Sequence, residues 1–152
     1  MQITSPAFLN GAKIPSKYTC EGKDINPPLD FKDVPREAKS LCLIMEDPDV
    51  PHTIRKDGRW IHWILFNIPP TLRSIDEGSR PPGILGKGTG NRTAYQGPCP
   101  PDRRHRYYFT LYALDTLLSL PQGSTKEEVE KAMQGHIVAK SELMGTYEKL
   151  TG

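Results

Sequence analysis

The sequence predicts a mainly β protein, built as an antiparallel sandwich with a helical C-terminal piece. Three apolar or aromatic runs come before the helical region, and no alternation of strands with helices is present. The 15 prolines and 13 glycines lie between these runs instead of forming a low-complexity block, which indicates many turns and short strands. Two packed antiparallel sheets are the natural way to bury such runs.

Each predicted strand has a distinct composition. Residues 40–46 are a short, nearly continuous apolar run, which is typical of a buried strand. Residues 60–68 form the longest aromatic and β-branched run, and Pro69 stops it, so we expect a central strand there. Residues 106–114 are again rich in aromatic side chains that favour strands.

The C-terminal third predicts helical structure. Ser124 or Thr125 can cap a helix that continues to residue 134 and ends at Gly135. A second helical or mixed segment is expected from residue 136 to about residue 148. Before this region, the Gly-rich residues 76–91 are expected to form a long surface loop.

Size, charge and hydropathy limit the classes of protein to consider. A chain of 152 residues predicts one domain, residues 1–152. A net charge of +2 without a clustered basic stripe gives no case for a nucleic-acid partner. No apolar stretch approaches the roughly 20 residues of a transmembrane helix, and the first ten residues lack the pattern of a secretory signal. We therefore expect a cytoplasmic protein, and the absence of GxGxxG and P-loop motifs predicts no cofactor.

Two proline-locked polar segments predict the functional site: Asp47-Pro48-Asp49-Val50-Pro51 and Gly97-Pro98-Cys99-Pro100-Pro101. Each adjoins a strand-like run that carries a histidine, His62 or His105. Prolines fix their own φ and push the preceding residue toward extended conformations, so nearby carboxylates and amides are held in place. The two segments are therefore predicted to form two walls of one small anion-binding pocket.

The charges of this pocket predict how binding depends on pH. An anion beside Asp47 and Asp49 needs protonated histidines or backbone N–H groups to offset the repulsion. Binding should weaken as His62 and His105 lose their charge. The structural alternative is that the two aspartates only cap turns, while the histidines bond to each other or to the backbone.

Three cysteines, an odd number, leave at least one thiol free or paired with another chain. Their spacing matches no zinc-binding pattern. A disulfide between Cys20 and Cys99 is compatible with the sequence, but the expected cytoplasmic location disfavours it.

Seven motifs, in order, carry a resemblance to a known family: Tyr18-Thr19-Cys20-Glu21-Gly22, Pro27-Pro28-Leu29, Asp47-Pro48-Asp49-Val50-Pro51, Trp60-Ile61-His62-Trp63, Gly97-Pro98-Cys99-Pro100-Pro101, His105-Arg106-Tyr107 and Leu111-Tyr112-Ala113-Leu114. Over nearly its whole length the chain resembles the phosphatidylethanolamine-binding protein family, in its bacterial and archaeal Raf-kinase-inhibitor-like branch. Asn26, where this branch usually has serine, and residues 90–96 depart from the pattern at the rim of the pocket.

The resemblance implies a Greek-key β-sandwich and a pocket for phosphate-like or carboxylate-like anions, including phospholipid headgroups. It also implies a regulator of kinases or other signalling partners, and a homodimer. Carried over by motif, the residues that line the pocket are Asp47, Asp49, His62, Pro98, His105 and Tyr107.

Two other chemistries remain open. Asp47, Asp49, His62 and His105 are adequate ligands for a divalent metal, although no HxH or HxxxH spacing supports such a site. Alternatively, the Cys99 thiol is a hydrolase nucleophile, activated by His105 or His62. A binding protein is expected over an enzyme, because nothing in the sequence indicates a lowered thiol pKa.

Proline density near the site also predicts a cis peptide bond. The expected positions are the Arg80-Pro81-Pro82 segment and the bonds next to Pro48 and Pro51.

Overall fold

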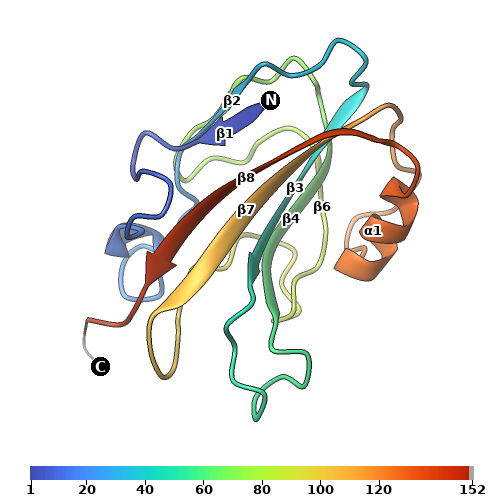
Figure 1. The fold of residues 1–152 in the computed structure, drawn as a ribbon. Coiled ribbons are helices and arrows are strands. Elements are labelled where there is room, and N and C mark those ends of the chain that lie inside the picture. Colours follow the sequence, from blue (N-terminus) through green and yellow to red (C-terminus); the bar gives the residue numbers. More distant parts are fainter. Residues whose placement is uncertain (151–152) are drawn as a thin grey trace.

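The computed structural model describes residues 1–150 and contains two antiparallel sheets. The larger sheet has the order β6-β4-β3-β7-β8 (Figure 1). The smaller sheet has the order β1-β2-β5. The larger sheet consists of β3 (Ser40–Asp47), β4 (Trp60–Ile68), β6 (Ile84–Leu85), β7 (His105–Leu114) and β8 (Ile137–Tyr147). The smaller sheet consists of β1 (Gln2–Thr4), β2 (Leu29–Lys32) and β5 (Ser74–Ile75). The predicted mainly β, antiparallel fold is confirmed.

The connection to β7 gives the larger sheet its Greek-key order. Strand β4 follows β3 and pairs with it, and β6 pairs with β4 after the chain has passed through β5 of the smaller sheet. The chain then returns so that β7 pairs with the free side of β3. This return places β7 against β3 over seven residue pairs, from Ser40 with Leu114 to Glu46 with Tyr108. The end of β3 therefore meets the beginnings of both β4 and β7, which is where the site forms.

The buried strand β3 packs on both faces, which explains its continuous apolar sequence. Leu41, Leu43 and Met45 belong to the core between the two sheets. Cys42 and Ile44 point to the opposite face and belong to a second cluster that includes two residues of the helix α1 (Lys126–Met133). Both faces of the strand are thus removed from water, as a nearly unbroken apolar run requires.

The predicted helix is confirmed, with its cap at Thr125. The Thr125 hydroxyl accepts a hydrogen bond from the Glu128 backbone N–H, and the Glu128 carboxylate accepts one from the Thr125 N–H. This reciprocal capping box satisfies two donors of the first turn. A short 3-10 helix, Ser16–Tyr18, is the other helical element of the described residues. None of the helices within residues 1–150 is long and apolar enough to cross a membrane.

Three expectations for individual segments are wrong. The second helical segment, residues 136–148, is instead strand β8, because β7 offers it a pairing edge from His105 to Leu114. The long loop of residues 76–91 contains the short strand β6, which pairs with β4. No cis peptide bond occurs in residues 1–150, so all the X-Pro bonds near the site are trans.

Candidate functional site

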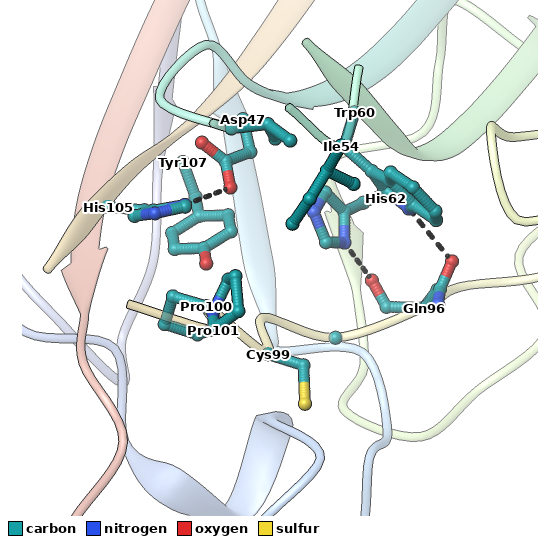
Figure 2. A pocket seen from close by; sticks show the side chains of 12 residues that line it. Asp47, Ile54, Trp60, His62, Gln96, Cys99, Pro100, Pro101, His105 and Tyr107 are labelled. Atoms are coloured by element: carbon teal, nitrogen blue, oxygen red, sulfur yellow. Dashed lines mark hydrogen bonds and ion pairs between the residues drawn. The ribbon is translucent and has the colours of Figure 1, made fainter. Parts of the chain in front are cut away.

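A cavity of about 240 Å³ lies where β3 ends and where β4 and β7 begin. Asp47 is the last residue of β3, His62 lies near the start of β4, and His105 and Tyr107 lie at the start of β7. All four side chains line the cavity (Figure 2). The antiparallel register brings them together although they are up to 60 residues apart in sequence, as Asp47 pairs with Trp60 and Glu46 with Tyr108.

The base of the cavity is a histidine held between two carboxylates. His105 Nδ1 lies 2.6 Å from Asp47 Oδ2, and His105 Nε2 lies 2.7 Å from Asp102 Oδ1. Two such hydrogen bonds need two protons, one more than a neutral imidazole supplies. Whichever atom carries the extra proton, the three groups together hold one net negative charge. Both nitrogens of His105 are therefore already occupied and are not free for a ligand.

Asp47 is buried and keeps few free lone pairs. Its Oδ1 accepts a hydrogen bond of 2.8 Å from the Asp49 backbone N–H, while Oδ2 faces His105. Burial raises the pKa of Asp47, and the hydrogen bonds from His105 and Asp49 partly offset this effect. Asp47 therefore serves first to position His105 and the turn at Pro48.

His62 is the second imidazole of the cavity, and only one of its nitrogens has a hydrogen bond within residues 1–150. Its Nδ1 lies 2.7 Å from the Gln96 carbonyl oxygen, and because a carbonyl only accepts, Nδ1 carries the proton. Burial lowers the pKa of His62 to about 4, against the opposing effect of this hydrogen bond. At neutral pH the ring is therefore uncharged, and its Nε2 offers a lone pair. Figure 2 shows this edge of the ring turned toward the middle of the cavity.

The Tyr107 hydroxyl is a buried polar group without a partner in the described part of the protein. The side chain is fully buried, and its oxygen has no hydrogen bond within residues 1–150. The ring contacts both histidines, edge-on to His62 with centroids 5.3 Å apart and stacked beside His105 at 6.5 Å. Burial and the nearby negative charge of Asp47 raise the pKa of Tyr107, so the hydroxyl keeps its proton and is a donor in the cavity.

Asp49 and Pro98 are not among the residues that line the cavity. The Asp49 carboxylate makes a two-pronged ion pair with Arg106, at 2.8 Å to Nη2 and 3.0 Å to Nε, and it also accepts from the Arg106 backbone N–H. These bonds lower the pKa of Asp49. Pro98 is buried, and its carbonyl accepts a hydrogen bond from the Cys20 N–H. Both residues hold the walls in place from outside.

The upper wall of the cavity is apolar. Ile54 is 53% exposed, on the loop between β3 and β4, and Trp60 lies behind it. The Trp60 indole N–H donates to Gln96 Oε1 at 3.2 Å, which ties the ring to the same residue that orients His62. The opposite wall is formed by Pro100 and Pro101 (Figure 2). Polar groups at the base and apolar walls near the mouth suit a ligand with a polar head.

A disulfide bond joins Cys20 and Cys99, so the expectation that a cytoplasmic setting disfavours it does not describe this structure. The two cysteines are brought together because the segment before residue 99 runs beside the segment that follows η1, Ser16–Tyr18. Cys42 remains a free thiol, buried in the core below α1. Cys99 thus lines the cavity as half of a disulfide and not as a thiol.

The structure also bears on the metal alternative. Within residues 1–150 no three or more histidine, cysteine, aspartate or glutamate side chains are grouped so that they could hold a metal ion. Of the four proposed ligands, Asp49 is paired with Arg106, and Asp47 and His105 are bonded to each other.

Sequence reasoning missed two residues that organise the site. Gln96 orients His62 through its backbone carbonyl, which no side-chain pattern reveals. Asp102 lies three residues before His105, and this short spacing was the only signal for it in the sequence. Asn26, the departure from the family pattern, is buried away from the cavity and donates to the Asp76 carbonyl at 3.0 Å.

Comparisons with known proteins identify the family of this chain. A family model described as "Phosphatidylethanolamine-binding protein" matches residues 4–148. An UPF0098 protein from Chlamydia trachomatis is 56% identical over 149 residues, covering 98% of this chain and 99% of that protein. Another from Methanothermobacter thermautotrophicus is 44% identical over 155 residues, covering 98% of this chain and 99% of its own.

Two solved structures extend the likeness to three dimensions. A putative phosphatidylethanolamine-binding protein homologue from Chlamydia trachomatis superposes with a TM-score of 0.96 at 56% identity, covering 97% of each chain. E. coli YbcL superposes with a TM-score of 0.87 at 27% identity, covering 97% of this chain and 98% of YbcL. The motifs, the fold and these matches show that the chain belongs to the phosphatidylethanolamine-binding protein family.

Proposed function

We propose that this protein binds a small anion, with a phosphate, carboxylate or phospholipid headgroup in the cavity between β3, β4 and β7. The observation that carries the proposal is the buried Tyr107 hydroxyl, which has no partner within residues 1–150 and faces a cavity of about 240 Å³. A buried donor without a partner costs free energy, and a ligand oxygen would remove that cost. Family membership supports the same class of ligand.

The donors and acceptors of the cavity favour an anion that brings a proton. Tyr107 donates to a ligand oxygen, whereas the unprotonated His62 Nε2 can only accept. A phosphate monoester monoanion supplies the missing O–H, and otherwise His62 takes a proton as the anion binds. Either route consumes one proton, so binding weakens as pH rises through the second phosphate pKa near 6. The exposed Arg103 and Arg104, on the loop between Pro101 and His105, add positive charge to the segment that follows the proline wall.

The biological use of this site is regulatory in our proposal. The ligand-dependent state of the cavity would be read by a protein partner, a kinase or another signalling protein, in the cytoplasm. A homodimer is part of the same proposal, on the strength of the family branch. The hydrolase alternative needs a free Cys99 thiolate, which the disulfide to Cys20 withholds.

The test is calorimetric titration with phosphate, O-phosphoethanolamine and acetate at about pH 6 and pH 8, comparing the wild type with Tyr107→Phe. The matched control is Tyr108→Phe, because Tyr108 is the next residue on β7 and its hydroxyl interacts with Arg106 instead of the cavity. Saturable binding that is weaker at pH 8 and is reduced in Tyr107→Phe alone would support the proposal. If none of the three anions binds at either pH, the proposal is wrong.

A further inference from the structure

We propose that the Cys20–Cys99 disulfide is an exchangeable redox switch that sets the order of one wall of the cavity. The effect on ligand affinity rests on the function proposed above, whereas the exchange and the change in the wall do not. Both cysteines are solvent-exposed, although they join two segments 79 residues apart. Exposed disulfides are the ones that thiols can attack, whereas structural disulfides are usually protected.

The wall that carries Cys99 has few other means of attachment. Pro98, Pro100 and Pro101 have no backbone N–H, so three of the four residues 98–101 cannot donate a hydrogen bond. The attachments that remain for residues 98–101 are the Pro98 carbonyl, which accepts from the Cys20 N–H at 3.1 Å, the packing of the buried Pro98 and Pro100, and the disulfide itself. Breaking the disulfide therefore removes a large part of what holds this wall.

Residues 95–97, just before this wall, are firmly held. Reduction of the disulfide is therefore expected to change the wall of the cavity and not the segment that precedes it. The Gly97 N–H donates to Asp24 Oδ1 at 2.7 Å, and the Tyr95 hydroxyl donates to the Tyr18 carbonyl at 2.8 Å. Gly97 is also packed so closely that an added Cβ would lie 2.3 Å from the Tyr18 carbonyl oxygen. Reduction is thus expected to loosen residues 98–104 and not to unfold the sheet.

The loosened segment would include two groups of the site. Pro100 and Pro101 form the wall opposite Ile54, and Asp102 supplies the second carboxylate to His105. Movement of this loop would open the cavity and weaken the hydrogen bond to His105 Nε2. The redox state of the disulfide is thereby coupled to the geometry on which the ligand depends.

The exchange is an ordinary dithiol reaction. A thiolate of an external dithiol attacks one sulfur of the Cys20–Cys99 bond, that bond breaks, and the released thiolate takes up a proton. The second thiol of the reagent then attacks the mixed disulfide. Two electrons and two protons pass to Cys20 and Cys99, and the reagent becomes a disulfide.

The first measurement uses the folded full chain in dithiothreitol buffers of graded redox ratio, quenched with an alkylating reagent and analysed by mass spectrometry. We expect Cys20 and Cys99 to become alkylated together as the buffer becomes more reducing. Cys42 is the internal control, because it is buried and burial raises the pKa of its thiol, so it should stay unmodified in the folded protein. A disulfide that stays closed in excess dithiothreitol would overturn the proposal.

The second measurement is amide hydrogen exchange of the oxidised and reduced proteins and of a Cys20→Ser/Cys99→Ser variant. At short labelling times, when the amides of the strands are still protected, we expect exchange to become about tenfold faster in residues 98–104 of the reduced protein and of the variant. Unchanged exchange in this segment, or equally fast exchange of the strands at these short times, would overturn a local switch.

The third measurement is calorimetry with phosphate at about pH 6 on the oxidised and reduced proteins. Affinity is expected to fall by about fivefold or more on reduction, since the binding geometry is no longer preorganised. Equal affinity in the two states would refute the coupling to the ligand. If the oxidised protein binds no anion, the proposed function fails, while alkylation and hydrogen exchange still decide the switch.

Discussion

Replacing Tyr107 by phenylalanine should separate ligand binding from stability. In most buried tyrosines the hydroxyl has a protein partner, and removing it costs about 1 kcal/mol of stability. Here the oxygen has no partner within residues 1–150, although the side chain is fully buried. The Tyr107→Phe change should therefore leave the free energy of unfolding unchanged, or raise it by up to about 1 kcal/mol by removing an unsatisfied group.

The same change should weaken the binding of an anion considerably. A hydrogen bond from an uncharged donor to a charged acceptor contributes about 1.5–3 kcal/mol, which corresponds to roughly 10- to 150-fold in Kd. The cavity otherwise offers the ligand mainly His62 Nε2, which is an acceptor at neutral pH. The loss of Tyr107 as a donor therefore cannot be replaced by a neighbouring side chain.

The assay is urea unfolding monitored by circular dichroism, together with phosphate titration by calorimetry, for wild type, Tyr107→Phe and Tyr108→Phe. Stability should be equal or higher and affinity lower in Tyr107→Phe, while Tyr108→Phe should keep the wild-type affinity. A loss of stability above about 1 kcal/mol in Tyr107→Phe would refute the reasoning, because it would mean that the hydroxyl makes a stabilising bond in the free protein.

Three further predictions concern stability. His62 has a folded-state pKa of about 4, below its unfolded value, so the unfolded chain binds more protons and stability should fall by roughly 3 kcal/mol between pH 6.5 and pH 4. Measured by urea unfolding across this pH range, the free energy of unfolding should fall less in His62→Gln than in the wild type. The control His52→Gln, at an exposed site, should behave like the wild type. Gly97→Ala places a Cβ 2.3 Å from a backbone oxygen, so its thermal midpoint should drop clearly, and an unchanged midpoint would contradict the tight packing. A Cys20→Ser/Cys99→Ser variant opens a loop of 79 residues, and on the chain-entropy model this lowers the free energy of unfolding by about 4.5 kcal/mol. If urea unfolding of this variant shows that the free energy of unfolding falls by less than about 1 kcal/mol, the unfolded chain gains little conformational freedom when the disulfide is removed.

Local sequence signals predicted the elements that have a strong pattern of their own. The runs at residues 40–46, 60–68 and 106–114 became β3, β4 and most of β7, because aromatic and β-branched side chains in short runs fit a pleated, buried surface. The cap at Thr125 likewise depends on residues only three positions apart. Such signals are contained within a few neighbouring residues, so they survive without knowledge of the fold.

Strand β8 shows where local signals fail. Residues 137–147 include alanine, lysine, glutamate, leucine and methionine, which favour helices, and the first half of the strand is largely exposed. The segment is nevertheless extended, because it pairs with β7 over its whole length. Pairing with a strand that lies more than 20 residues earlier is a tertiary effect, and it overrides a weak local preference.

The candidate site also combines features that the sequence predicts with features that only the fold determines. The sequence pattern by itself determined that Asp47, His62 and His105 are candidates, because each lies at the end or beginning of a recognisable strand, and the family resemblance added Tyr107. Only the tertiary structure decided their roles. It turned Asp49 toward Arg106, as ion pairs form between side chains that the fold brings together.

The charge of the cavity also depends on the tertiary structure. Burial makes His62 neutral, and the two carboxylates beside His105 occupy both of its nitrogens, so neither histidine is the free cation that the sequence suggested. A residue type fixes which protons a side chain can exchange, whereas its protonation and its partners depend on burial and on neighbours from other strands. For this protein the sequence therefore determined the candidates and the folded chain determined their chemistry.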